Sequence, residues 1–390
     1  MIKEVEVSVR PDELNDDELL RRRLSRKCGL SPENIHTFEI VRKSIDARRA
    51  PVFRLRIRVF SGKDGPTERG SVADSYREVS EGEEIHIIGA GPAGYFAALE
   101  CLKCGLRQIV FERGKDVRAR RRDLRAIQQF GEVDKDSNYC FGEGGAGTYS
   151  DGKLYTRSRK RGNVEEVLQI LIEHGAKPDI MVDAHPHIGS NKLPQIITAI
   201  RKRIEEHGGQ ILFQHRVTDL QVGKDGIEAV QINGETKIPV KHVVLATGHS
   251  ARDIFGLLFD HKIRLEEKPF ALGVRVEHPQ ELIDKFQYGQ ASRPAALPAA
   301  SYRLATEIEG RGVYSFCMCP GGLVVPASTA PGELVVNGMS MSRRDSKFAN
   351  AGLVVSVQPG DWHKLGFEPP LGGMRFQEMV ERRLFSASDG

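Results

Sequence analysis

The sequence predicts an α/β protein built on a parallel sheet, with a mostly β second domain and a small α+β module at the N-terminus. Two short apolar runs, 85–88 and 109–111, flank a helical pattern, which is the order of a β-α-β unit. From residue 270 onward, apolar runs alternate with turn residues, which indicates antiparallel strands. Residues 1–60 show a strand, a charged amphipathic helix and two further strands, the pattern of a separate module.

Length and composition set broad limits. The 390 residues suffice for two or three domains with a sizeable core, and a net charge of +4 gives no reason to expect nucleic acid or a membrane surface as partner. No apolar run approaches the roughly 20 residues of a membrane-spanning helix, and the charged N-terminus lacks a signal-peptide core. The six cysteines show no zinc-site spacing, so we expect reduced thiols and a cytoplasmic location.

The β-α-β unit carries the spacing G-x-G-x-x-G at Gly89, Gly91 and Gly94, between the first strand and the helix. Gly89 allows a tight turn, Gly91 lets the backbone approach a pyrophosphate, and Gly94 lets the helix lie close to the strand. Free N–H groups at the positive end of the helix dipole then face the phosphates. Glu112 ends the second strand, where a carboxylate can accept hydrogen bonds from a ribose. These features predict a Rossmann-like dinucleotide site, and the alternative is a degenerate fold that has lost its ligand.

We expect the chain to divide into four parts. The module at 1–60 predicts strands at 5–9, 35–41 and 52–60 and a helix at 12–28, which suggests a ferredoxin-like unit. Residues 61–83, rich in glycine and charge, predict a linker. The dinucleotide-binding domain comprises 84–160 and 193–260, and the substrate or cap domain comprises 161–192 and 261–390.

Two segments follow Glu112. We interpret the arginines at 113, 118, 120, 121, 122 and 125 as a solvated helix with one or two side chains near the cofactor phosphates, because no aromatic residues interleave with the charge as in a nucleic-acid site. The stretch 141–154, FGEGGAGTYSDGKL, can run its backbone along a flat ring or a phosphate, since its glycines carry no Cβ atoms. A surface loop without a ligand is the alternative.

The order of elements after residue 193 favours FAD as the dinucleotide. A helix at 193–207, a strand at 211–213, a three-stranded excursion over 217–239 and a strand at 242–245 lead to Ala246, Thr247 and Gly248. This order recurs in the FAD-binding fold of flavoprotein oxidoreductases, where Gly248 would let the chain pass close to the cofactor. No second G-x-G-x-x-G unit follows a strand, so we expect no separate pyridine-nucleotide domain.

Histidine and cysteine pairs invite other interpretations. His185 and His187 flank a proline without an acidic or cysteine partner at metal-site spacing, so we expect a polar loop entering the pocket rather than a metal site. Cys317 and Cys319 could exchange with a flavin or form a disulfide, but we favour small apolar side chains on one face of a strand. Cys101 and Cys104 both lie inside the predicted first helix, which disfavours a redox pair.

The combined motifs resemble a bacterial family of FAD-dependent dehydrogenases described as NAD(FAD)-utilizing and, more distantly, the glutathione-reductase-like flavoproteins. The matching stretches are SIDARR at 44–49, IIGAGPAG at 87–94, FGEGGAGTYSDGKL at 141–154, HPHIGSNKL at 185–193, ATGHSARD at 246–253 and FCMCPGG at 316–322. The resemblance implies that Gly91, Gly94 and Glu112 bind the ADP half of FAD. It also implies that the glycine loop at 144–147 lies near the pyrophosphate and isoalloxazine, and that Val217 meets the adenine through its backbone. The predicted cofactor contacts are Gly89, Gly91, Pro92, Ala93, Gly94, Glu112, Arg113, Gly144, Gly145, Ala146, Gly147, Val217, Ala246, Thr247 and Gly248.

Members of that family usually continue to a glycine-rich segment that contacts the ribityl chain and the flavin ring, whereas this sequence ends at Gly390 without it. A truncation there predicts a weaker hold on the flavin ring.

We therefore predict an FAD-dependent oxidoreductase, a dehydrogenase or reductase of unassigned substrate in which the flavin carries the hydride. A flavin monooxygenase with a single dinucleotide domain and a non-catalytic flavin-binding protein stay open as alternatives. The expected partners are a small-molecule substrate and an electron donor or acceptor such as NAD(P)H. We expect neither nucleic acid nor a membrane span, and the sequence names no catalytic base and no oligomeric state.

Overall fold

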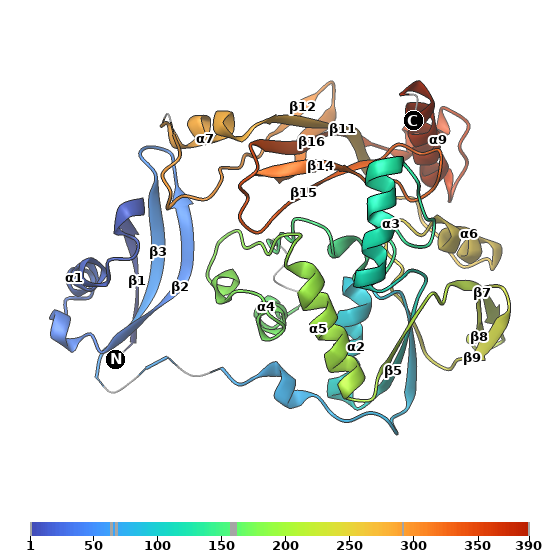
Figure 1. Ribbon diagram of the computed structural model, residues 1–390, viewed down its shortest axis with the longest axis horizontal. Coiled ribbons are helices and arrows are strands. Elements are labelled where there is room, and N and C mark those ends of the chain that lie inside the picture. Colours follow the sequence, from blue (N-terminus) through green and yellow to red (C-terminus); the bar gives the residue numbers. More distant parts are fainter. Residues whose placement is uncertain (1, 63–64, 67–68, 157–161, 291, 389–390) are drawn as a thin grey trace.

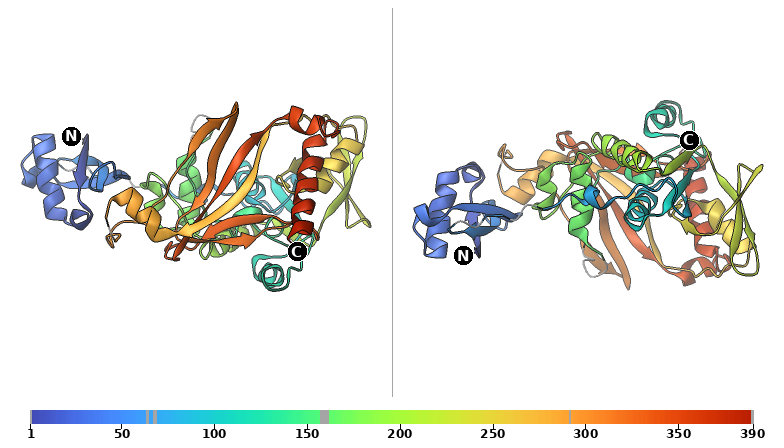
Figure 2. Two further views of the ribbon diagram at one scale, coloured as in Figure 1. Left: turned by 90° about the horizontal axis from the view of Figure 1, so that it is seen from above. Right: turned by 90° about the horizontal axis from the view of Figure 1, so that it is seen from below.

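The computed structural model describes residues 2–62, 65–66, 69–156, 162–290 and 292–388. Figure 1 shows three parts of the molecule. The small N-terminal module lies at the left, a sheet flanked by helices lies at the right, and a group of β-strands runs across the top. In the two views of Figure 2 the N-terminal module stands at one end of an elongated molecule.

The N-terminal module consists of β1 (Ile2–Val9), α1 (Asp17–Cys28), β2 (Thr37–Asp46) and β3 (Val52–Phe60), with antiparallel strands in the order β1-β3-β2. The side chain of Asp16 caps α1 by accepting a hydrogen bond of 2.9 Å from the Leu19 N–H, and Gly29 ends the helix at a φ of +66°. The order β1-α1-β2-β3 is the β-α-β-β order that we expected for this module.

The parallel sheet contains β4 (Glu84–Ile88), β5 (Arg107–Glu112), β6 (Gln210–Phe213) and β10 (Val243–Leu245) in the order β10-β4-β5-β6. β4 lies between β5 and β10, so the chain reverses its direction of winding at β4, as in a doubly wound fold. Apolar residues occupy both faces of β4 and β5, as expected for parallel strands covered on both sides.

One face of that sheet is covered by helices. Ile87 and Val110 pack in the same core as residues of α2 (Pro92–Cys104), α4 (Val164–Glu173) and α5 (Leu193–Glu206). The other face is covered by the antiparallel excursion β7 (Val217–Val222), β8 (Ile227–Ile232) and β9 (Thr236–Pro239), because Ile88 and Phe111 share a core with Val230. α3 (Val117–Phe130) follows β5, and α6 (Arg252–Asp260) follows β10.

Two segments differ from expectation in how they pack. Within the stretch expected as a linker, Val72–Ser75 forms a short 3₁₀ helix, and Tyr76 and Val79 are buried against the helix-covered core. α4 also belongs to that core, although we expected 161–192 to join the second domain. In both cases buried apolar side chains, rather than the polar and glycine-rich composition around them, decide the packing.

The second region is mostly β, as predicted. Its main antiparallel sheet has the order β11-β16-β13-β12, and β14 and β15 form a separate hairpin. The sequence patterns did not reveal β16, which pairs with both β11 and β13. The elements here are β11 (Phe270–Pro279), α7 (Gln280–Tyr288), β12 (Ala305–Ile308), β13 (Arg311–Cys319), β14 (Gly322–Pro326), β15 (Val336–Ser340), β16 (Phe348–Val357), α8 (Pro359–His363) and α9 (Gly372–Ala387).

The N-terminal module is joined to the rest of the chain by backbone and ionic contacts. Lys43 of β2 forms backbone hydrogen bonds with Val182 and Ala184, and its ammonium lies 3.0 Å from a carboxylate oxygen of Asp183. The buried core of the module continues into α7 and β16. Within the SIDARR stretch, Ser44 to Asp46 lie at the end of β2, and the Asp46 carboxylate forms an ion pair with Arg48 in the turn that follows.

Candidate functional site

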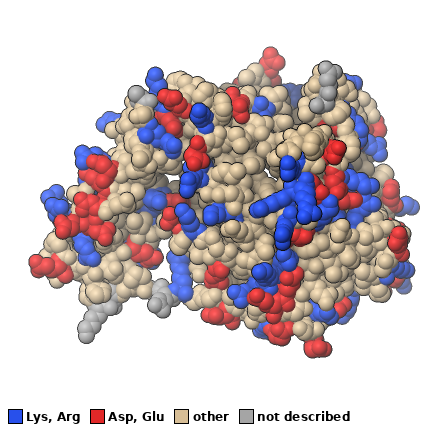
Figure 3. Space-filling model, in the orientation of Figure 1, with Lys and Arg blue, Asp and Glu red and all other residues tan. Residues whose placement is uncertain are grey.

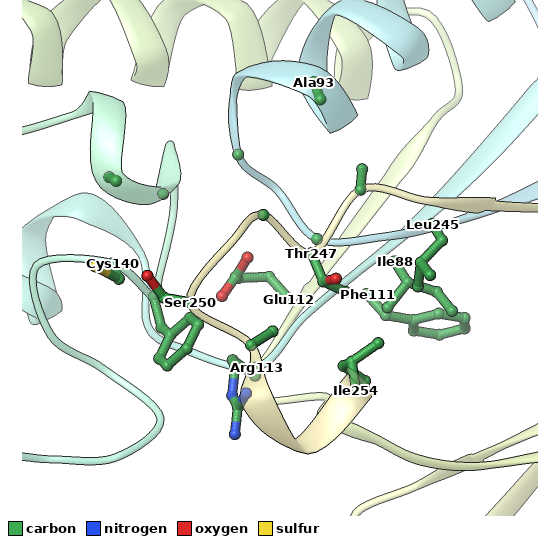
Figure 4. Close-up of a pocket in the computed structure, with 18 of the residues that line it drawn as sticks. Ile88, Ala93, Phe111, Glu112, Arg113, Cys140, Leu245, Thr247, Ser250 and Ile254 are labelled. Carbon is green, nitrogen blue, oxygen red and sulfur yellow. The ribbon is translucent and has the colours of Figure 1, made fainter. Parts of the chain in front are cut away.

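A pocket of about 410 Å³ opens where the β4–α2 turn, the loop after β10, the loop 138–148 and the start of β7 meet. In Figure 4, Glu112 lies at the centre of the labelled side chains, with Cys140 and Ser250 on one side and Phe111, Ile88 and Leu245 on the other. The pocket is lined by Ile88, Gly89, Gly91, Pro92, Ala93, Phe111, Glu112, Arg113, Cys140, Phe141, Gly145, Ala146, Gly147, His215, Arg216, Val217, Leu245, Ala246, Thr247, Gly248, His249, Ser250, Ala251 and Ile254.

The structure brings the predicted cofactor residues together, and all of them except Gly94 and Gly144 line this pocket. A Cβ atom on Gly94 would lie 1.9 Å from the carbonyl oxygen of Gly89, so this glycine lets α2 approach the turn. A Cβ atom on Gly144 would lie 2.0 Å from the Thr148 hydroxyl, so this glycine serves the fold of its own loop. Both glycines are therefore needed for the fold of the segments that form the pocket wall, although neither one lines the pocket itself.

Gly91 differs from these two because its missing side chain faces open space. Its φ is −75°, an ordinary value, and the nearest atom to a Cβ at this position would be the Gly145 Cα at 4.0 Å. Gly91 caps α2, whose first N–H groups have no partner within the helix. Pro92 at the first helical position loses no bond there, since that N–H would be unpaired in any case. The turn thus offers N–H donors and a positive helix end to an anion in the pocket.

Glu112 is buried and holds three loops together. One carboxylate oxygen accepts a hydrogen bond from the Ala90 N–H, and the other accepts from the N–H groups of Gly114 and Gly142, each at 2.9 Å. A carboxylate has about four acceptor sites, so roughly one is left for a ligand hydroxyl. Glu112 therefore fixes the shape of the pocket in addition to any contact it makes with a ribose.

The glycine loop is held from behind by Arg120 of α3, which is fully buried. Its guanidinium donates hydrogen bonds to the carbonyl oxygens of Asn138 at 2.7 Å, Glu143 at 2.8 Å and Gly145 at 2.9 Å. Burial lowers the pKa of Arg120 from its ordinary value. We expected a solvated helix with one or two arginines near the cofactor phosphates. Arg121 and Arg122 are exposed, whereas Arg120 is buried behind the glycine loop, so for Arg120 the solvated interpretation is wrong. Figure 3 shows blue side chains gathered over α3.

The sequence did contain a signal for Arg120. It falls in register with Val117, Leu124 and Ile127, the buried face of α3, where a charged side chain needs buried partners. Burial of the guanidinium is stabilised because the carbonyls of a glycine-rich loop, which has few side chains of its own, need donors.

Glu143 is the second residue that sequence reasoning missed. Its carboxylate is fully buried and accepts hydrogen bonds from the Tyr95 hydroxyl at 3.0 Å, the Val117 N–H at 2.7 Å and Arg201 at 2.8 Å. It therefore joins the loop to α2, α3 and α5. No spacing in the sequence pairs Glu143 with these residues, because they come from three separate helices.

Arg113 lines the pocket but its charge is already paired. It lies 2.8 Å from Asp136 and 3.0 Å from Asp253, and its guanidinium stacks 4.4 Å from the ring centre of Phe141. Arg216, at the same end of the pocket, also contacts Asp136, at 3.2 Å. These ion pairs leave Arg113 as a wall of the pocket rather than a free cation for a phosphate.

The loop after β10 closes the pocket on its third side. Gly248 has a φ of +74°, which favours glycine, and no atom lies within 4 Å of where its Cβ would be. A Cβ on Gly89 would meet the Ala246 carbonyl oxygen at 2.5 Å, so the two loops lie in close contact. Val217, the first residue of β7, is buried beneath them.

The histidine pair lies outside the pocket lining. His185 packs its ring 4.8 Å from that of Tyr155, and Nε2 of His187 lies 3.2 Å from the Ser342 carbonyl oxygen. Within the described residues, no group of three or more histidine, cysteine or acidic side chains is arranged to hold a metal ion. Cys101 and Cys104 lie in α2, as predicted.

Three families match parts of the chain. Residues 1–60 match a domain of unknown function, residues 112–292 match the flavin containing amine oxidoreductases, and residues 269–390 match the C-terminal domain of FAD-dependent proteins. An uncharacterised protein of Clostridium beijerinckii is 38% identical over 395 residues, which cover 97% of this chain and 73% of that protein. The chain belongs to the same family as that protein. It is an FAD-dependent oxidoreductase.

Solved structures show only weak likeness to this FAD-dependent oxidoreductase. The THI4 protein of Thermovibrio ammonificans is 19% identical, with 48% of this chain and 67% of that one covered and a TM-score of 0.33. The tetracycline destructase Tet(51) is 12% identical, with 77% and 67% covered and a TM-score of 0.34. CtdE in complex with FAD is 13% identical, with 70% and 59% covered and a TM-score of 0.30. Likeness at this level carries no argument about substrate or mechanism.

The residues of the pocket fit FAD. The helix N-terminus offers N–H donors for a pyrophosphate, Gly91 and Gly248 leave open space, and Glu112 keeps an acceptor. The rest of the lining is largely apolar, which suits an adenosine moiety. Within the described residues, no helix is both long and apolar enough to cross a membrane.

Proposed function

We propose that this pocket holds the ADP half of FAD and that the protein is a dehydrogenase or reductase of the glutathione-reductase type. The observation that carries the proposal is the convergence of Gly89–Ala93, Gly145–Gly147 and Ala246–Gly248, which lie far apart in the sequence, on one pocket. In a doubly wound sheet, ligands bind beyond the carboxyl ends of the strands, and β4, β5 and β10 all end at this pocket.

Each wall has a proposed role. The α2 N-terminus binds the pyrophosphate, the free acceptor site of Glu112 binds a ribose hydroxyl, and Val217 with its neighbours lines the adenine end. Gly145 to Gly147 cover the part of the cofactor that leads toward the flavin ring. When bound, FAD supplies the ring that accepts or donates a hydride, and the protein binds and orients it and excludes water.

The roles of the two regions follow from the same proposal. The parallel sheet and its helices, with α4 included, form the cofactor-binding domain, and the strands after residue 269 form the domain that covers the substrate side. The substrate is a small molecule, with NAD(P)H as a candidate electron donor. A cytoplasmic location is part of this proposal, since all six cysteines are free thiols.

Titration of the purified protein, stripped of cofactor, with FAD tests where the cofactor binds. Because the proposed pocket grips the ADP half, ADP should displace FAD and FMN should compete poorly, as followed by flavin fluorescence. Equal competition by FMN and ADP would contradict the proposed orientation. Rapid NADPH oxidation that depends on an aromatic substrate would favour a monooxygenase over a dehydrogenase.

A further inference from the structure

Two thiols of the second region share one cation contributed by the cofactor-binding region. Cys317 and Cys319 lie at the end of β13, and the ammonium of Lys153 lies 3.6 Å from the sulfur of Cys317 and 3.4 Å from that of Cys319. We had favoured an interpretation of both cysteines as small apolar side chains, but apolar side chains gain nothing from a neighbouring ammonium. An ammonium beside a sulfur instead stabilises a thiolate, the reactive form of cysteine.

The backbone at Cys317 is strained. Its φ is +45°, which is uncommon for a residue other than glycine, and the pairing of β13 with β16 shifts register between Phe316 and Cys319. Arg275 fastens this conformation, because it donates hydrogen bonds to the Cys317 carbonyl oxygen at 3.3 Å and to the side chain of Asn350. Strain that the surrounding structure holds in place is a feature of functional sites.

The charges around Cys317 favour its thiolate. The Cys319 thiol donates a hydrogen bond to the Cys317 carbonyl oxygen at 3.3 Å. The adjacent Cys319 side chain, Lys153 and Arg275 lower the pKa of Cys317, against burial and the nearby Asp151, which raise it. The neighbouring Cys317 side chain and burial raise the pKa of Cys319. The two thiols are therefore unequal, and the ionised form is favoured at Cys317 over Cys319.

The remaining charged neighbours are held by Asp151 rather than by the sulfurs. Arg344 lies 2.7 Å from Asp151, the Ser340 hydroxyl donates a hydrogen bond to the same carboxylate, and Lys153 lies 2.9 Å from it. Burial and the charge of Arg344 lower the pKa of nearby His187, which favours its neutral form. Lys153 is thus positioned by Asp151 while its ammonium faces both sulfurs.

Access distinguishes the two thiols further. Cys319 is fully buried, Cys317 is half-buried, and the Lys153 side chain keeps 34% of its surface exposed. A small reagent can therefore reach Cys317 first, because Cys319 has no exposed surface.

We propose that Cys317 and Cys319 form a thiol–disulfide exchange site for a small organic disulfide, with Cys317 as the attacking thiolate and Cys319 as the resolving thiol. The Cys317 thiolate attacks one sulfur of the substrate, so that a mixed disulfide forms and the first product leaves as a thiolate that takes a proton. Cys319 gives up its proton and attacks the Cys317 sulfur, which releases the second product thiol. One disulfide is reduced to two thiols, and the cysteine pair is oxidised to one intramolecular disulfide.

This site goes beyond the proposed function, since neither cysteine nor Lys153 lines the FAD pocket and its first turnover needs no flavin. A further turnover needs two electrons to reduce the Cys317–Cys319 disulfide again. Reduced FAD, the cofactor of the proposed function, is an electron donor of the required kind.

The first test measures the thiolate. The full-length protein is treated with iodoacetamide at neutral pH, and the rate at each cysteine is followed by mass spectrometry, with the exposed Cys104 of α2 as internal control. We expect Cys317 to react at least about tenfold faster than Cys104. Lys153→Met should abolish that advantage, and Lys153→Arg, which keeps the charge, should restore much of it. Equal rates at the two cysteines, or no effect of Lys153→Met in a folded protein, would overturn the proposal.

The second test measures the exchange itself with 2-hydroxyethyl disulfide as the probe. The wild-type protein should release two equivalents of mercaptoethanol and form a Cys317–Cys319 disulfide, seen as a loss of two hydrogens from their peptide. Cys319→Ser should stop at the mixed disulfide after one equivalent. A wild-type protein that does not react, or that also stops at the mixed disulfide, would refute the role of Cys319.

Discussion

At the scale of single residues, the glycines of the fingerprint separate into two kinds. Gly91 faces open space, whereas a side chain on Gly94 would collide with the backbone of the turn. The distinction matters because a loss of cofactor can arise from a blocked site or from a disturbed fold.

Gly91→Ala should leave the stability of the cofactor-free protein nearly unchanged but weaken FAD binding by at least about tenfold, since the methyl group occupies the space for a phosphate. Gly94→Ala is the matched control and should lower the thermal unfolding temperature even without FAD. Thermal unfolding and a fluorescence titration measure the two effects. Normal FAD affinity in Gly91→Ala would contradict the proposal that the phosphates bind at this turn.

Glu112→Gln should lower the free energy of unfolding of the cofactor-free protein by about 1–3 kcal/mol, because an amide NH₂ then meets a backbone N–H that had an acceptor. Glu100→Gln, on the exposed face of α2, should change it by less than about 0.5 kcal/mol. Denaturant unfolding measures both. If only FAD affinity fell in Glu112→Gln, the three backbone contacts would not stabilise the loops.

At the scale of elements, the glycine loop depends on α3. Arg120→Met should leave the carbonyls of Asn138, Glu143 and Gly145 without their donor and lower the free energy of unfolding by about 2–4 kcal/mol. Arg122→Met changes an exposed arginine of the same helix and serves as control. Limited proteolysis should show faster cleavage within 138–150 only in Arg120→Met. Equal protection in both variants would contradict the role of Arg120.

The sequence was most informative where one element contains its whole signal. The turn at Gly89 to Gly94, the end of α1 at Gly29 and the mostly β character after residue 269 all depend on local spacing and were predicted. The burial of Arg120, the three-helix contact of Glu143 and the strand β16 depend on which distant elements pack together. An apolar run such as that of β16 does not by itself name its partners, because its pairing is fixed by β11 and β13.

At the scale of the whole molecule, Asp151 joins the cofactor-binding region to the second region through Arg344 and Ser340. Burial alone would raise the pKa of Asp151, but Arg344 and Lys153 bring it below its ordinary value. The unfolded chain therefore binds the proton more tightly. The stability that this carboxylate contributes is present near neutral pH and is lost as the pH falls through the lowered pKa.

Unfolding of the wild-type protein should accordingly become easier as the pH falls below about 4, and Asp151→Asn should remove part of that dependence while lowering stability at neutral pH. Chemical denaturation across the acid range up to neutral pH measures both. An identical pH profile in Asp151→Asn would show that this junction does not depend on the charge of Asp151.

In our proposal, three segments distant in sequence form one FAD site. Hydrogen–deuterium exchange of the full chain with and without FAD tests it most directly, because it reports on backbone N–H groups along the whole chain. We expect FAD to slow exchange in 89–95, 141–148 and 245–250 and to leave α1 unchanged. Protection confined to other segments, or none at saturating FAD, would contradict the placement of the cofactor in this pocket.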